Sequence, residues 1–285
     1  MTNKERLTIV KVGGAVVEDD SRLRHLLSQF MAIDGRKLLV HGGGRRATQV
    51  AGRLGIESTM VKGRRVTDAS MLEVVTMVYG GLVNKHIVAS LQAIGINAIG
   101  LTGADAGIIT AHRREPKRLL LTAEELAALP QFVADGQPGA DAYVTVDYGF
   151  VGDVDRADGA MLGRLVESGL VPVVAPLTHD GCGSLLNTNA DTMAQTVACA
   201  LAADYEVTLV YAFEKPGVLA SPDDDTSVIP QITRQDFARL TADGTISGGM
   251  LPKIENALCA VEAGVREVVI TSAEGIAGTG GTRIV

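Results

Sequence analysis

The sequence predicts an α/β fold with an open, mainly parallel sheet in a three-layer αβα sandwich. Strand-like and helix-like segments alternate along the 285 residues, which is typical of parallel sheets with helical crossovers. Within the first fifty or so residues, two apolar strands also run into glycines and then into helices. Two such units in tandem indicate a phosphate-handling site where parallel strands end.

The first unit begins with Leu7–Val12, which is rich in residues typical of strands. Gly13 and Gly14 follow, and a helix is expected from Asp20 to Met31. Lys11 lies on the strand itself, and a buried lysine needs a partner or a ligand.

The second unit is the strand Leu38–Val40, then His41, three glycines at 42–44 and a helix over Ala47–Leu54. Backbone N–H groups at a helix N-terminus bind anions, because unpaired amides and the positive end of the helix dipole point the same way. Glycine leaves that backbone open, since it has no Cβ. We expect His41 to be structural and not a catalytic base.

A hairpin is expected next, with strands at Ser58–Val61 and Arg65–Thr67. Thr67 or Asp68 then caps a long helix that ends near Ile94. A stripe at helical spacing is expected to form its buried side: Met71, Val74, Val75, Val78, Leu82 and Ile87. Gly80 and Gly81 cost about 1 kcal/mol each in mid-helix, which a close helix–helix approach, such as one between subunits, would explain.

The middle of the chain continues the alternation. Residues 113–142 are polar and are expected to form an excursion between two strands of a hairpin, with a helical piece at Ala123–Leu129. The elements expected around this excursion are strands at Asn97–Leu101 and Tyr143–Val151, a helix from Asp155 to Gly169 and a buried strand at Val171–Ala175.

The last third has the same pattern, and the lobe boundary is expected near residues 176–180, giving lobes of residues 1–178 and 179–285. Asn189 is suited to cap a helix that starts near Asp191 and runs to Ala203. The other expected elements are a strand at Glu206–Tyr211, a helix that opens at 246–253 and runs to about Ala263, and a final strand at Glu267–Thr271.

Composition excludes several classes of protein. A hydrophobic content of 46% and a mean hydropathy of +0.22 indicate a globular chain. The net charge of −7 argues against non-specific nucleic-acid binding, which needs a basic face. No apolar run approaches the roughly 20 residues of a membrane span. Three scattered cysteines predict a reducing, cytoplasmic compartment and no metal cage.

Two lysines have unusual positions. Lys11 lies on an apparently buried strand, and Lys253 lies in the first turn of a helix, where the dipole disfavours a cation. Both positions make sense if an anionic phosphate lies between them. A solvated surface lysine explains Lys253 equally well from its position alone.

The main rival is a dinucleotide-binding oxidoreductase. Gly42-x-Gly44-x-x-Ala47 fits the relaxed fingerprint G-x-G-x-x-A. No clear acidic residue ends a second strand about 20 residues on, because Asp68, near that distance, is expected to cap a helix. The P-loop motif G-x-x-x-x-G-K-[ST] does not occur in the sequence.

Five motifs together resemble the amino acid kinase family in content and order. The resemblance covers Leu7 to Ile270, and each motif alone is unspecific. The motifs are Lys11-Val-Gly-Gly, His41-Gly-Gly-Gly, Gly63-Arg64-Arg65-Val66-Thr67, Asn187-Thr-Asn189-Ala-Asp191 and Gly249-Met-Leu-Pro-Lys253. Within the family, the chain is similar to the kinases that phosphorylate acylated glutamate in arginine biosynthesis.

The resemblance implies an amino acid kinase-like sandwich and a role for each motif. Lys11 and Lys253 would contact the transferring phosphoryl group, and Asp191 would orient both lysines. The remaining roles divide between substrate and nucleotide. Gly43, Gly44, Arg65 and Asn187 would bind the acylated glutamate, and Gly13, Gly14, Glu214, Gly217, Leu219, Thr245 and Ser247 would lie at the nucleotide. Mg²⁺ would arrive with ATP, and no protein metal site is expected.

The chemistry agrees with this implication. A glutamate γ-carboxylate has a pKa near 4.3 in peptides, so it is ionised at neutral pH and needs no general base. The obstacle is repulsion between two anions, which positive charge and oriented amides lower. Other kinases of the same fold, acting on carbamate, aspartate or UMP, stay open, as does a sensor that binds without catalysis.

The sequence departs from the family pattern in three places. Glu214 replaces the usual Asp and Gly248 varies among relatives, so details of nucleotide binding are open. Arg64 replaces an apolar residue before the substrate arginine. Alternation along a strand would direct Arg64 to solvent, whereas a twisted hairpin would let it pair with the extra carboxylate of N-succinylglutamate.

Assembly is the last expectation from the sequence. Arginine-inhibited members of the family carry an extra N-terminal helix that links dimers into hexamers. About six residues precede the first strand here, too few for that helix. We therefore expect a homodimer packed through the long helix, little inhibition by arginine, and no nucleic-acid or membrane partner.

Overall fold

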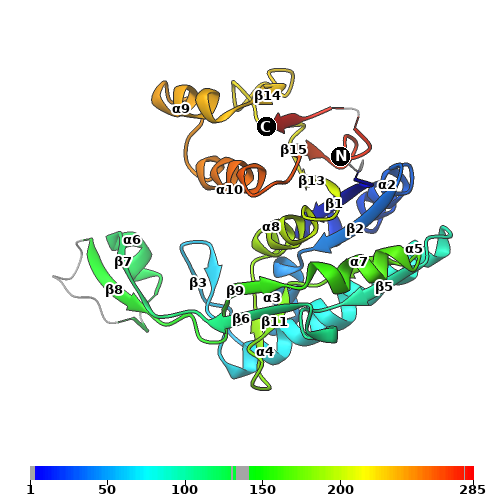
Figure 1. Ribbon diagram of the computed structural model, residues 1–285. Helices are drawn as coiled ribbons and strands as arrows, with labels where there is room; N and C mark the ends of the chain where they lie inside the picture. Colours follow the sequence, from blue (N-terminus) through cyan, green and yellow to red (C-terminus); the bar gives the residue numbers. More distant parts are fainter. Residues whose placement is uncertain (1–3, 130, 133–140, 279) are drawn as a thin grey trace.

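An eight-stranded sheet organises the molecule (Figure 1), and the computed structural model describes residues 4–129, 131–132, 141–278 and 280–285. The order of its strands is β14 (Gln231–Ile232), β16 (Thr282–Ile284), β15 (Glu267–Ser272), β13 (Glu206–Phe213), β1 (Arg6–Val12), β2 (Arg36–His41), β10 (Val171–Val174) and β5 (Ala98–Leu101). Neighbouring strands are parallel except β15 and β16. The predicted open, mainly parallel sheet is confirmed.

Helices cover both faces of this sheet. Alternate side chains of a strand point to opposite faces, and β1 divides in this way: Leu7 and Ile9 enter one core, Val10 and Val12 the other. The first core is covered by α7 (Gly159–Glu167), α8 (Ala190–Leu201), α9 (Arg234–Ala242) and α10 (Met250–Glu262). The second is covered by α1 (Gly14–Val17), α2 (Asp20–Met31), α3 (Gly44–Arg53) and the long helix over 69–93. This is the predicted three-layer sandwich.

The long helix has three parts: α4 (Ala69–Val75), a π-helical segment η1 (Thr76–Val83) and α5 (Asn84–Ala93). Asp68 caps it through a 2.8 Å hydrogen bond from the Met71 N–H to its Oδ1. The predicted span is confirmed, but the predicted stripe is wrong at Leu82, which is 49% exposed, whereas Tyr79 and Val83 are buried. A π-helical turn carries an extra residue, and this shifts the buried side by one position.

The same helix also qualifies the expectation about membrane spans. The helix has 25 residues, and a window of 18 of them has a mean hydropathy of 1.3, which is enough, by length and composition alone, to cross a membrane. Of that window, 44% is buried inside the molecule, and α5 packs on β5 and β10. That packing is typical of a core helix.

A second, four-stranded sheet and two hairpins lie beside the sandwich. The sheet has the order β12 (Leu185–Asn187), β11 (Leu177–His179), β6 (Ile109–Arg113) and β9 (Gly152–Ala157), with the 3₁₀ turn η2 (Asp105–Gly107) before β6. The hairpins are β3 (Met60–Val61) with β4 (Arg64–Arg65), and β7 (Lys117–Leu121) with β8 (Ala142–Val146), with α6 (Ala123–Ala127) after β7. A small core around Val61, Val144 and Tyr148 joins the two hairpins.

Several predicted boundaries are wrong. The strand expected to reach Val151 ends at Val146. The helix expected from Asp155 begins at Gly159, because Gly152–Ala157 pairs with β6 instead. The helix expected from Ala47 begins at Gly44. Part of the predicted excursion at 113–142 lies outside the described residues, and its described part holds β7 and α6.

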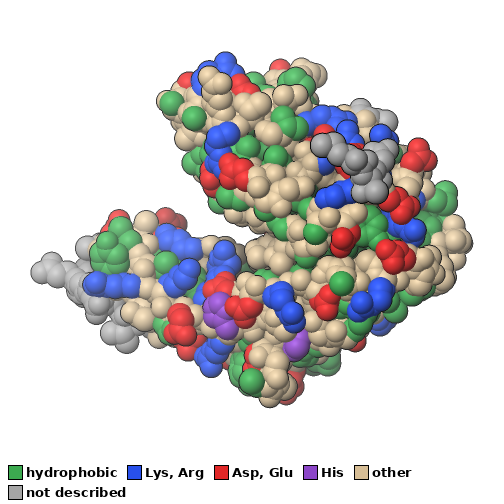
Figure 2. Space-filling view, viewed as in Figure 1, with side chains coloured by type: hydrophobic (Ala, Val, Ile, Leu, Met, Phe, Trp, Pro, Cys, Tyr) green, Lys and Arg blue, Asp and Glu red, His purple; other side chains and the backbone are tan. Residues whose placement is uncertain are grey.

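The strands that end at the site come from both halves of the sequence. β1 pairs in register with β13, so Lys11 lies beside Tyr211. In Figure 1, α9 and α10 lie at one end of the molecule and the hairpin of β7 and β8 at another. Figure 2 shows the surface deeply hollowed between these two parts.

Candidate active site

Two glycine turns meet edge to edge at the ends of β1 and β2. A Cβ on Gly14 would lie 3.6 Å from the Gly43 nitrogen and 3.7 Å from the Gly44 nitrogen. A Cβ on Gly42 would lie 3.3 Å from the Gly14 nitrogen. Gly43 is the N-cap of α3 and provides no side-chain cap, so the first amides of that helix can bind an anion.

Lys11 has the partner that its burial requires. The side chain is 9% exposed, and its Nζ lies 2.7 Å from Oδ1 of Asp191 in the first turn of α8. Asn189 caps that helix, as predicted, by accepting from the N–H groups of Asp191 and Thr192. The cap fixes the start of α8, and the start of α8 places Asp191 against the lysine.

Lys253 lies across the same cavity but does not share this ion pair. Its Nζ lies 4.1 Å from the centroid of the Phe213 ring, and Lys11 Nζ lies 5.3 Å from the same centroid. The aromatic face attracts both cations and keeps them near one point. Phe213 ends β13 and was not among the predicted site residues.

A cavity of about 520 Å³ contains both lysines. Four cations and two carboxylates line it, leaving an excess of positive charge suited to phosphate. They are Lys11, Arg45, Lys215 and Lys253, and Asp191 and Glu214. Glu214 is exposed and lies 4.0 Å from Arg45.

The predicted nucleotide residues divide into two groups. Gly13, Gly14, Glu214 and Gly217 line the lysine cavity, whereas Leu219, Thr245 and Ser247 are not among its lining residues. Gly217 has a packing reason to be glycine, because a Cβ there would lie 2.8 Å from Val228 Cγ1.

A second cavity, of about 200 Å³, adjoins the first at Gly44, which lines both. It brings together all five residues predicted to bind the acceptor: Gly43, Gly44, Arg64, Arg65 and Asn187. They come from the β2–α3 turn, from β4 and from β12. Segments far apart in sequence therefore converge on one small pocket.

Arg65 is buried and held in place by the chain around it. Its Nη2 donates to the Gly44 carbonyl at 2.8 Å and to Thr48 Oγ1 at 2.9 Å. Its Nη1 donates to Ser58 Oγ. A guanidinium has five N–H donors, so further donors remain for a carboxylate in the pocket.

Asn187 is also oriented before any substrate binds. Its Nδ2 donates to Thr67 Oγ1 at 3.0 Å. Among the described residues, Oδ1 of Asn187 has no recorded hydrogen-bond donor. That oxygen is suited to accept an amide N–H in the pocket.

Arg64 is exposed whereas Arg65 is buried, as strand alternation predicts. It still lines the acceptor cavity. Partial burial, together with the positive charge of Arg114, holds the pKa of Arg64 below its usual value. Arg114 is itself buried and paired with Asp153, so a second guanidinium lies behind Arg64.

His41 is buried at the end of β2 and bonds to the glycine turn that follows it. Its Nδ1 donates to the Gly42 carbonyl at 2.8 Å, and its Nε2 accepts from Asn84 Nδ2 at 3.2 Å. Burial lowers the pKa of His41 to about 4, so the ring is neutral at pH 7. A structural role fits this position.

Three residues at this site were absent from the sequence-based prediction: Phe213, Tyr79 and Asn84. Tyr79 lines the acceptor cavity from the long helix, and Asn84 bonds His41. An ordinary α-helical period predicts Leu82, and not Tyr79, on the buried side of the helix. The glycine pair at 80–81 was the local signal in the sequence that this helix is irregular.

The fold and the two joined cavities define a phosphate-handling α/β enzyme, and comparison with known proteins gives its family. The family model "Amino acid kinase family" matches residues 6–272. The chain belongs to the amino acid kinase family. It is therefore a kinase, which excludes the dinucleotide-binding oxidoreductase.

Individual relatives agree with this assignment. Acetylglutamate kinase of Bacteroides fragilis is 55% identical over 281 residues, covering 99% of this chain and 97% of the relative. Acetylglutamate kinase of Cytophaga hutchinsonii is 45% identical over 95% of this chain and 93% of its own. The structure of carbamate kinase from Giardia lamblia bound to AMP-PNP has a TM-score of 0.63 at 15% identity, covering 100% of this chain and 99% of that one, which shows a shared fold.

Proposed function

We propose that this kinase transfers the γ-phosphate of ATP to the γ-carboxylate of N-acetylglutamate, or of N-succinylglutamate, a step of arginine biosynthesis. The observation that carries the proposal is the junction of the two cavities at Gly44. One cavity holds Arg65 and Asn187, which suit a carboxylate and an amide. The other holds Lys11 and Lys253, which suit phosphates. The names of the relatives agree with this substrate.

The residues divide the chemistry as follows. Arg65 binds the α-carboxylate, and Asn187 accepts from the acyl amide. The γ-carboxylate reaches the amides of Gly43 and Gly44 and attacks the terminal phosphate already ionised. Lys11 and Lys253 neutralise charge on the transferred group, and Asp191 holds Lys11. We assign residues 1–178 to acceptor binding and dimerisation and residues 179–285 to the nucleotide, with Asn187 completing the acceptor pocket and Lys11 reaching the phosphates.

ATP brings Mg²⁺ with it in this proposal. Among the described residues, no cluster of three or more His, Cys, Asp or Glu side chains could hold a metal, and Asp191 is engaged with Lys11. Mg²⁺ commonly keeps several waters and binds through substrate phosphates. We also propose that the enzyme is cytoplasmic. ATP is abundant in that compartment, and its reducing conditions keep cysteines such as Cys182 free.

The activity is tested by trapping the acyl phosphate with hydroxylamine. With ATP, Mg²⁺ and N-acetylglutamate, we expect a hydroxamate to accumulate together with ADP. Reactions without ATP, or with carbamate, aspartate or UMP as acceptor, are the controls. Calorimetric binding of both substrates without turnover would instead indicate a sensor.

Arg64 leads to a proposal about the acyl group. A second carboxylate, as in N-succinylglutamate, would reach Arg64 from the acceptor cavity and form a charge-assisted hydrogen bond. Such a bond is worth about 1.5–3 kcal/mol, so a preference on the order of ten- to a hundredfold is expected. The measurement compares kcat/KM for both substrates in the wild type and in Arg64→Leu. If the wild type prefers N-acetylglutamate, or if Arg64→Leu leaves the ratio of the two kcat/KM values unchanged, then Arg64 has no part in selecting the acyl group.

The outer side of the long helix supports the proposed homodimer. Met77 is 53% exposed and Leu82 49%, and nothing lies within 4 Å of a Cβ built on Gly81. Light scattering should give twice the chain mass of 29.7 kDa, and Leu82→Lys should give monomers. Leu120→Lys, on an equally exposed leucine of β7, is the control. A wild-type monomer or hexamer would contradict this assembly.

A further inference from the structure

The π-helical segment turns two side chains of the long helix toward the glycine turn: Tyr79 lines the acceptor cavity, and Asn84 bonds His41. Tyr79 and Asn84 are five residues apart, which in an α-helix of 3.6 residues per turn would separate them by about 140°. In η1 the hydrogen bonds run between residues five apart, so these two positions come onto one side. Both are buried, at 4% and 0% exposure.

Tyr79 fills the space that a side chain at position 43 would need. Its Cδ1 lies 3.0 Å from the position of a Cβ on Gly43. Val83, one turn later, lies 3.6 Å from that position through its Cγ2. The ring is therefore the surface on which the amide-bearing turn rests.

The hydroxyl of Tyr79 and the acceptor arginine lie against the same glycine. The hydroxyl lies 3.9 Å from the position of a Cβ on Gly44, and Arg65 Nη2 lies 3.8 Å from the same position. Burial raises the pKa of Tyr79, and the nearby charge of Arg65 partly opposes that rise. Arg65 Nη2 in turn donates to the Gly44 carbonyl, so the phenol, the guanidinium and the glycine turn form one polar cluster.

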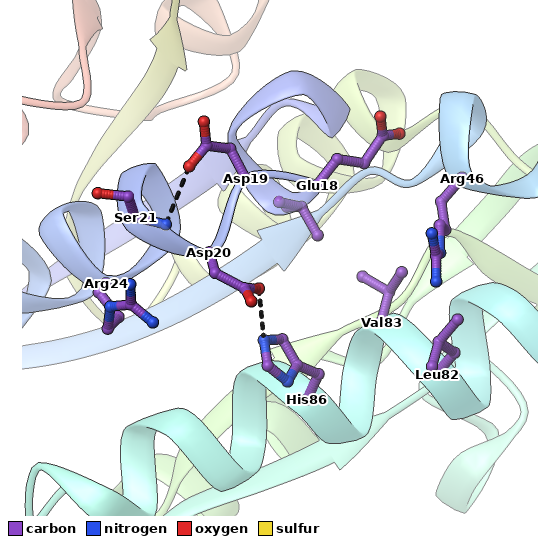
Figure 3. Close-up of a pocket in the computed structure, with 10 residues that line it drawn as sticks. Glu18, Asp19, Asp20, Ser21, Arg24, Arg46, Leu82, Val83 and His86 are labelled. Carbon is purple, nitrogen blue, oxygen red and sulfur yellow. Dashed lines mark hydrogen bonds and ion pairs between the residues drawn. The ribbon is translucent and has the colours of Figure 1, made fainter.

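The helix that carries Tyr79 makes further contacts beyond the glycine turn. Figure 3 shows a separate pocket in which His86 is directed toward Asp20 at the start of α2 and Leu82 lies near Arg46. His86 Nε2 lies 3.4 Å from Asp20 Oδ1. Below the turn, Asn84 Nδ2 donates to the Val173 carbonyl at 2.9 Å. The Asn84 bond ties the helix to β10 directly after the π-helical segment, so the segment that carries Tyr79 is anchored at its C-terminal end.

We propose that Tyr79 is a positioning residue for the acceptor substrate, which the π-helical segment brings against Gly43 and Arg65. This inference rests on the proposed function, because it assigns Tyr79 a part in binding N-acetylglutamate. The ring holds the amides of the glycine turn, and the hydroxyl holds the guanidinium in the direction of the α-carboxylate. Tyr79 takes no part in proton transfer.

The test removes the hydroxyl and keeps the ring. In Tyr79→Phe we expect the KM and the calorimetric Kd for N-acetylglutamate to rise about 3- to 10-fold, which is the magnitude of one lost polar contact. We expect kcat to stay within about twofold and the KM for ATP to stay unchanged, because Lys11 and Lys253 are not touched. Tyr79→Leu, which also removes the ring, should lower kcat as well.

Tyr205→Phe is the matched control. Tyr205 is equally buried, and its hydroxyl donates to Glu167 Oε1 at 3.2 Å, away from both cavities. It should lose stability without changing either KM. A second comparison adds Tyr79→Phe to the Arg65→Lys variant. Because Arg65→Lys removes the guanidinium on which the hydroxyl acts, adding Tyr79→Phe should change the Kd for N-acetylglutamate little further.

The outcomes separate this inference from the proposed function. An unchanged KM and Kd in Tyr79→Phe, or an equal rise in Tyr205→Phe, would overturn the role of Tyr79. A full effect in the Arg65→Lys background would overturn its action through Arg65. A wild type that binds N-acetylglutamate but forms no acyl phosphate would overturn the proposed function alone, because Kd still tests Tyr79. No binding at all would overturn both.

Discussion

Replacing Lys11 or Lys253 by alanine should lower kcat by about 10²–10³-fold, the usual cost of one donor to developing charge, with a much smaller change in either KM. Charge moves onto the transferred oxygens as the reaction proceeds, so contacts to those oxygens strengthen in the transition state. Loss of such a contact lowers kcat and kcat/KM together. Steady-state kinetics with varied ATP and varied N-acetylglutamate measure the three constants.

The larger loss is expected for Lys11. Its removal leaves Asp191 unpaired beside the phosphates, and a half-buried carboxylate would repel them. Within the described part of the chain, Lys253 contacts the Phe213 ring and forms no ion pair, so we expect its removal to leave no opposed charge. Lys215→Ala is the control, because this lysine lines the same cavity but is exposed and paired with Asp225 at 2.8 Å. An increased KM with unchanged kcat would contradict the role given to either lysine.

Replacing Arg65 by alanine should raise the KM for N-acetylglutamate on the order of 100-fold, since two charge-assisted hydrogen bonds are lost. The α-carboxylate is bound alike before and during transfer, so kcat should fall much less. The KM for ATP should not change, because Arg65 lies in the other cavity.

Arg65 also holds Gly44, Thr48 and Ser58, so the variant should be less stable. Its melting temperature must be measured to separate unfolding from weak binding. Arg64→Ala provides the comparison, because this guanidinium is exposed and is not the one proposed to bind the α-carboxylate, so its loss should change the KM for N-acetylglutamate little. A fall in kcat with an unchanged KM would contradict the binding role of Arg65.

Local signals in the sequence predicted much of this site. A glycine turn, a helix cap such as Asn189 and a lysine on an apolar strand depend on neighbouring residues, and such features can be recognised before the fold is known. The expectation that buried Lys11 needs a partner was confirmed by Asp191. The convergence of Arg65 and Asn187 followed from the motifs and their resemblance to a family.

Features that depend on distant contacts were missed. The pairing of β6 with β9 joins segments about 40 residues apart, and no local pattern separates β9 from the helix expected there. In the sequence, Phe213 is an ordinary apolar residue at the end of a strand. Its role becomes visible only in the structure, where Lys11 and Lys253 both lie over its ring. The π-helical segment buries Tyr79 and Val83 and leaves Leu82 exposed, which the ordinary α-helical period does not predict.

Direct attack of the γ-carboxylate on ATP is the central claim, and an isotope label tests it most directly. N-acetylglutamate labelled with ¹⁸O in the γ-carboxylate is incubated with the enzyme, ATP and Mg²⁺, and the product is observed by ³¹P NMR. Attack by this carboxylate leaves one labelled oxygen between carbon and phosphorus, so the acyl-phosphate resonance should carry the ¹⁸O isotope shift. An acyl phosphate without that shift, or ADP formed without any acyl phosphate, would contradict the account.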